Sequence, residues 1–165
     1  MSSIDLKLAY NKPVTLPHDI AVKVQDLINK AADSLLLQGT RCTSDGSCAN
    51  KNKEGKHCAF GWVLHHFGIA DEDMPVTGSY KLTLATLKAN HVFKSGSEEF
   101  SISHPDLNGL WYGIQTIHDQ SFAKTTCKPL CDNLFKKLCI AYPQINFCKW
   151  KDIASGDWLM LVDKD

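Results

Sequence analysis

A long amphipathic segment, residues 17–39, limits the fold of this chain more than any other feature. Its apolar side chains recur at three- and four-residue intervals, and its charged residues lie outside that stripe, as in a helix that buries one face. Gly39 follows as a C-terminal stop. The pattern predicts a helix over 19–38, whose buried stripe comprises Ile20, Val24, Leu27, Ile28, Ala31 and Leu35.

Two further segments carry helical signatures. Residues 126–142 show an apolar stripe that includes Leu134, with Thr126 as the candidate N-cap and Pro143 after the last turn. Residues 56–67 are rich in aromatic and small side chains and are followed by a glycine. We expect the helix over 126–142 to pack against the first helix, with the 56–67 helix held between them.

The segments between these helices have weaker patterns. Residues 79–90 favour a helix over a strand, with Ser79 as a cap, whereas 110–117 suits a strand or a helical turn equally. Residues 91–109 contain Gly, Ser and Pro and indicate irregular chain or a short hairpin. These segments leave room for a small amount of strand in a helical protein.

The C-terminal tail, residues 143–165, is rich in large apolar side chains, Trp150 and Trp158 among them. These side chains need cover, so we expect the tail to pack back onto the body. A chain of 165 residues has the length of one ordinary domain. The expected fold is therefore mainly α, a single compact helical domain over 1–165, with a short β-hairpin or edge strands allowed.

Charge and composition exclude several classes of protein. Lys plus Arg and Asp plus Glu number 18 each, so no global field favours nucleic acid or an anionic membrane, and neither partner is expected. No stretch reaches the roughly 18 apolar residues of a membrane span, and the N-terminus lacks a signal-peptide pattern. The seven cysteines are odd in number and are expected to be free thiols in the cytoplasm.

The polar segment before the second helix is locally basic. It carries Arg41, Lys51, Lys53 and Lys56 against only two acidic residues. Such a segment is either a solvated loop or a loop that contacts an anion. We keep its four basic residues as binding candidates.

Cys58 is the candidate nucleophile. A helix N-terminus favours a thiolate, and a cysteine hydrolase or amidase also needs a histidine base and a group that orients it. His57 or His118 would be the base and Asp119 the orienting group. The residues that surround the catalytic cysteine in papain-like enzymes are absent, so an enzyme is an alternative and not the leading hypothesis.

Packing is the favoured role of Cys58. Free cysteine behaves as a small buried hydrophobe, and Ala59 and Gly61 continue a run of small residues. Glycine in mid-helix costs about 1 kcal/mol relative to alanine. Its presence predicts that another backbone crosses the helix closely at Gly61.

Zinc binding is a third interpretation of the same region. The potential ligands are Cys42, Cys48, His57 and Cys58, spaced C-x5-C-x8-H-C. Structural zinc sites usually contain two pairs of ligands, each pair separated by two to four residues. Because adjacent His57 and Cys58 do not form such a pair, no cofactor is expected, with zinc kept as an alternative.

Two short motifs resemble those of a family of small uncharacterised phage and actinobacterial proteins. That family carries Cys-Ala-x-Gly on a helix, as in residues 58–61, and a downstream Asn-Asp before a helix. Here His118 stands in place of the Asn, and Trp62 stands where Ala is usual. The resemblance covers about residues 18–142 and implies a mostly helical protein of phage or bacterial origin, without implying an activity.

The leading functional hypothesis is an accessory protein that binds a host or phage protein in the cytoplasm. P-loop, GxGxxG, GxSxG and HExxH patterns are absent, and this removes the usual support for nucleotide-dependent and common hydrolase functions. Trp111, Tyr112 and Trp150 are candidate interface anchors. The alternatives are the cysteine-dependent hydrolase that uses Cys58 and the zinc-stabilised module.

Overall fold

A computed structural model describes residues 13–44, 47–90, 102, 104–120 and 127–155. These residues form a mainly α protein, as predicted, and their one sheet is a two-stranded antiparallel hairpin. The helices are α2 (His18–Gln38), α3 (Ala59–Phe67), α4 (Tyr80–Ala89), α6 (Asn108–Gln120), α7 (Cys127–Ala141) and α8 (Cys148–Ser155). The hairpin strands are β1 (Thr43–Ser44) and β2 (Ser47–Cys48), and the 3-10 turns are η1 (Asp71–Asp73) and η2 (Pro105–Leu107).

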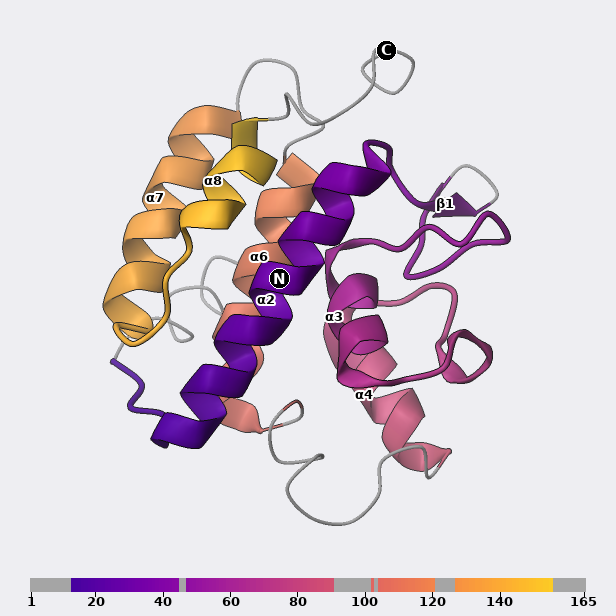
Figure 1. Ribbon diagram of the computed structural model, residues 1–165, viewed down its shortest axis with the longest axis horizontal. Coiled ribbons are helices and arrows are strands. Elements are labelled where there is room, and N and C mark those ends of the chain that lie inside the picture. Colours follow the sequence, from indigo (N-terminus) through magenta and orange to yellow (C-terminus); the bar gives the residue numbers. More distant parts are fainter. Residues whose placement is uncertain (1–12, 45–46, 91–101, 103, 121–126, 156–165) are drawn as a thin grey trace.

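Helix α2 confirms the strongest sequence prediction. All six residues of the expected stripe are buried. Gly39 ends the helix in the left-handed conformation, with φ 68°, and its N–H donates to the Leu35 oxygen at 2.9 Å. Figure 1 shows α2 between the α7–α8 pair and helix α3, so its stripe faces protein on both sides.

The predicted pairing of the first and last amphipathic helices is wrong. Helix α3 packs on α2 as expected, but its second neighbour is α6, whereas α7 lies mainly against α6 and α8. The cause is the segment 110–117, whose ambiguous pattern belongs to a 13-residue helix with its own apolar stripe. Helix α6 thus takes the place beside α3 that was predicted for the 126–142 helix, and the buried members of its stripe are Leu110, Trp111, Ile114 and Ile117.

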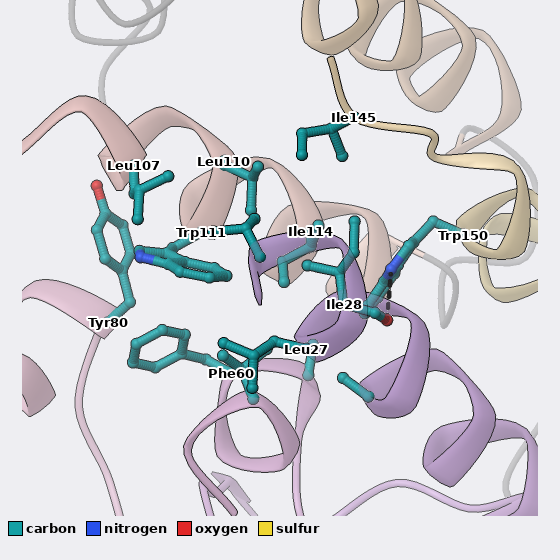
Figure 2. Close-up of a cluster of buried hydrophobic side chains, with 14 of the residues drawn as sticks. Leu27, Ile28, Phe60, Tyr80, Leu107, Leu110, Trp111, Ile114, Ile145 and Trp150 are labelled. Carbon is teal, nitrogen blue, oxygen red and sulfur yellow. Dashed lines mark hydrogen bonds between the residues drawn. The ribbon is translucent and has the colours of Figure 1, made fainter. Parts of the chain in front are cut away.

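Two buried tryptophans tie separate segments of the chain together. Trp150 of α8 donates from Nε1 to the Ile28 oxygen at 3.1 Å (Figure 2). Trp111 of α6 donates to the Ile102 oxygen at 2.8 Å and lies 5.8 Å from Phe60, ring centre to ring centre. Helix α8 therefore packs onto α2 and α6, whereas residues 156–165 of the predicted tail, Trp158 among them, lie outside the described residues.

The structure can be compared with several predictions about shorter segments. The segment predicted as a helix over 79–90 contains α4 (Tyr80–Ala89), and the Ser79 hydroxyl accepts from the Leu82 N–H at 3.2 Å as its N-cap. The strands fall in the basic loop, and most of the alternative hairpin region 91–109 lies outside the described residues. Thr126 also lies outside them. No described helix combines the length and apolarity that crossing a membrane requires.

Candidate functional site

A cavity of about 360 Å³ opens beside the N-terminus of α3. Three other parts of the chain complete its wall: the loop just after β2, the start of α4 and one face of α6. Its described lining residues are Ala49, Asn50, Cys58, Phe60, Gly78, Ser79, Tyr80, Lys81, Tyr112, Gln115, Thr116 and Asp119. The structure thus brings together two residues of the cysteine-enzyme hypothesis, Cys58 and Asp119.

Cys58 is the N-cap of α3 and does not lie inside the helix, which begins at Ala59. Its Sγ accepts the Gly61 N–H and donates to the Asn50 side-chain oxygen, each at 3.3 Å. The residue is 4% exposed. The thiol therefore satisfies a free backbone donor at the helix start, which adds a capping role to the packing role predicted from sequence.

Gly61 confirms the predicted close crossing. A Cβ built there would lie 2.1 Å from the backbone oxygen of Asn50. The crossing segment is the loop after β2, not another helix. Asn50 is fixed there because its Nδ2 donates to the Pro75 oxygen and to the Thr83 hydroxyl, each at 3.0 Å.

Gln115 links α6 to the start of α3. Its Oε1 accepts the Phe60 N–H at 2.9 Å, and its Nε2 donates to Asp119 Oδ1 at 2.8 Å. The same carboxylate oxygen lies 3.0 Å from Nδ1 of the fully buried His118. Asp119 Oδ1 is thus held from two sides, while Oδ2 has no hydrogen-bond partner among the described residues. Sequence reasoning missed Gln115, although its i, i+4 spacing to Asp119 places both on one helix face.

The aromatic residues predicted to bind a partner differ in their burial. Trp111 and Trp150 are fully buried, so neither is an interface anchor, and this corrects the expectation from sequence. They face inward because they lie on the apolar stripes of α6 and α8. Tyr112 is half-buried and lines the cavity together with Phe60 and Tyr80.

The basic loop residues lie around the hairpin and its return to α3. Lys51 donates to the backbone oxygen of Asp71, and Lys56 pairs with Glu54 at 3.2 Å. Arg41 is half-buried and Lys53 is exposed. An anion-contacting role for this loop stays a prediction.

The cysteine-based zinc set is not assembled. Cys42 donates from Sγ to the Lys56 oxygen at 3.2 Å, and Cys58 turns to Asn50. His57 instead places Nε2 2.8 Å from Asp71 Oδ1, and the hydrogen bond from His57 lowers the pKa of that carboxyl below its ordinary value. His57 and Cys58 are adjacent at the start of α3 but point to different sides, so their closeness in sequence does not make them ligands of one ion. The side chain of the fourth candidate, Cys48, lies outside the described part of the structure.

Alkylation rates test the buried capping role of Cys58. With iodoacetamide near neutral pH, the exposed Cys139 and Cys148 should react first, because alkylation requires an accessible thiolate. Cys58 should react slowly until the protein unfolds. Peptide mass spectrometry over time, with a sample in guanidinium as the control, measures this order. Selective early labelling of Cys58 would instead support the enzyme hypothesis.

Comparisons of this chain with protein-family models, curated proteins and solved structures found no match. The resemblance to the phage and actinobacterial family therefore stays a prediction.

Proposed function

We propose that this protein is a binding protein whose cavity accepts a small organic cation, an ammonium or guanidinium group on a short chain. The observation that most supports this proposal is the Asp119 carboxylate, which lines the cavity and is held there through one oxygen by Gln115 and His118. Its second oxygen is left for a ligand. A hydrogen bond between an ionised donor and a carboxylate is about twice as strong as a neutral one.

The walls of the cavity suit the rest of such a ligand. Phe60, Tyr80 and Tyr112 contribute aromatic surface, which attracts cations and covers aliphatic chains. A volume of about 360 Å³ is at the lower end for small-molecule sites. Lys81 also borders the cavity but is exposed, so its ammonium group can remain in water.

The cation has two sources with the same chemistry, a free small molecule or a Lys or Arg side chain of a partner protein. The second source agrees with the function expected from sequence, binding to a host or phage protein. It gives that hypothesis a new contact site, since Trp111 and Trp150 no longer supply anchors. The phage or bacterial origin and the cytoplasmic location remain part of this proposal.

The cysteine-hydrolase alternative keeps one supporting observation, the shared cavity of Cys58 and Asp119. Against it, the thiol is buried and caps α3. His57 lies against Asp71, and His118 is not among the described residues that line the cavity. The binding proposal needs no rearrangement of these side chains.

Calorimetric titration with matched probes tests the proposal. We expect n-butylguanidine and an acetylated arginine methylamide to bind, and the citrulline analogue, which is neutral and of similar shape, to bind at least about 10-fold more weakly. Asp119→Asn should abolish this preference, whereas Asp132→Asn, at an exposed position on α7, should leave it unchanged.

Comparing the affinities of the acetylated arginine methylamide and n-butylguanidine distinguishes the two sources of the cation. Tighter binding of the peptide-like probe favours a partner protein, and equal binding favours a free small molecule. Equal affinity for citrulline and arginine would contradict the proposal, as would cation binding that survives Asp119→Asn. Failure of every probe to bind would also overturn it.

A further inference from the structure

A second cluster of polar side chains lies outside the cavity, where the chain enters α3 and returns after it. His57 precedes the helix, His65 lies in its last turn, and Asp71 opens η1. One ligand atom from each of these residues falls within 4.8 Å of the others. We propose that His57, His65 and Asp71 form a binding site for a divalent transition-metal ion such as Zn²⁺.

The spacing of the three ligand atoms fits a common ion. Asp71 Oδ1 lies 2.8 Å from His57 Nε2 and 3.9 Å from His65 Nδ1. Bonds of about 2.0–2.1 Å to a tetrahedral ion separate ligand atoms by roughly 3.4 Å, which is between these two distances. Both His65 and Asp71 are about half-exposed, so small rotations of their side chains suffice.

The fold holds the buried ligand firmly. The backbone N–H and C=O of His57 are both hydrogen-bonded to the side chain of Gln38, each at 3.0 Å. The His57 ring lies against Trp62, with ring centres 4.3 Å apart. After α3, the left-handed Gly68 turns the chain back so that Asp71 meets the histidines. A rigid histidine faces two adjustable partners, and an ion can enter from the exposed side.

The donor set selects the kind of metal. Two imidazoles and one carboxylate suit Zn²⁺ and its first-row neighbours better than Mg²⁺ or Ca²⁺. Three protein ligands leave a fourth position for water. When the ion replaces the hydrogen bond between His57 and Asp71, a neutral His57 ring carries its proton on Nδ1, and the ion is held by Nε2.

Two features of the surroundings limit affinity. His57 Nδ1 is buried without a hydrogen-bond partner among the described residues, and loss of such an outer partner weakens metal sites by about 10–100-fold. The Lys51 ammonium group also lies at the backbone oxygen of Asp71. The neighbouring His66 is held separately, 2.7 Å from the Ser34 hydroxyl, and is not a ligand. We therefore expect a modest affinity.

Titration of the full chain with Zn²⁺ and Co²⁺ tests the site. Cys139→Ser and Cys148→Ser form the background, because exposed thiols bind both metals. We expect one equivalent of Zn²⁺ by calorimetry and a Co²⁺ spectrum without a thiolate charge-transfer band. His65→Gln and Asp71→Asn, both at half-exposed positions, should each weaken binding at least about 10-fold. His66→Gln is the matched control and should change little.

The result that overturns the site is equally specific. The proposed ligands are excluded if no saturable metal binding is found, or if both His65→Gln and Asp71→Asn leave the metal affinity unchanged. A thiolate-to-cobalt band would assign the metal to cysteines. Circular dichroism of each variant shows that the fold is kept. The outcome is independent of cation binding in the cavity, because the two sites share no described residue.

Discussion

Replacing Trp150 by alanine should lower the free energy of unfolding by about 3–5 kcal/mol. The side chain is fully buried and its indole N–H bonds to the Ile28 oxygen, so the truncation leaves a large cavity and removes a hydrogen bond between α8 and α2. Small domains are stable by about 5–15 kcal/mol, which makes this loss a large share of the total. Urea unfolding followed by far-ultraviolet circular dichroism measures it.

Two companion variants make the Trp150 result interpretable. Trp150→Phe keeps most of the ring and should lose less, so it remains measurable if the alanine variant does not fold. Lys151→Ala alters an exposed neighbour on the same helix and should change stability by less than about 0.5 kcal/mol. A loss below about 1 kcal/mol for Trp150→Ala would mean that α8 is not part of the core.

Long, periodic segments were predictable from sequence because their pattern is a direct consequence of burying one face. The stripe of α2 repeats from Ile20 to Leu35, more than four turns, so helix and core residues follow from it without knowledge of any neighbour. Helix α6 was ambiguous because its short apolar run fits strand and helix alike. Its place at the centre depends on contacts with α3, α7 and α8, which no local pattern contains.

Burial of the aromatic residues was harder to predict. Trp111 and Trp150 were expected at an interface, since tryptophan is common both in cores and in binding hot spots. Which role applies depends on the stripe that the residue joins once its helix is packed. Tyr112, next to Trp111, lies on another face of α6 and reaches the cavity.

The candidate sites show where sequence reasoning ends. Cys58 and Asp119 were named from motifs and do share a cavity, but Asn50 and Gln115, which hold them, belong to no motif. The sequence places His57 next to Cys58 as a possible zinc ligand, whereas in the structure its Nε2 lies 2.8 Å from Asp71 Oδ1. His65 lies near it on the last turn of α3, and the turn at Gly68 brings Asp71 back to both histidines. Such proximity comes from the path of the chain, not from ligand spacing.

The turn of α3 at Gly61 gives the sharpest test of this packing. By helix propensity alone, Gly61→Ala should stabilise the protein by about 1 kcal/mol. The structure predicts the opposite sign, because the new Cβ would lie 2.1 Å from the Asn50 backbone oxygen. Backbone cannot rotate away as a side chain can, so we expect a loss of about 1–3 kcal/mol for alanine and more for Gly61→Leu.

The change at Gly61 should also reach the cavity. Asn50 can move away from a new Cβ only by straining its hydrogen bonds to Pro75 and Thr83, and Asn50 is part of the cavity wall. Cation binding should therefore weaken together with stability in Gly61→Ala. Cys58→Ser is the control: it keeps an acceptor for the Gly61 N–H and should cost less than about 1 kcal/mol. A Gly61→Ala protein more stable than the parent would show that the loop after β2 does not cross α3 at this position. The cavity wall that Asn50 contributes would then be wrongly placed.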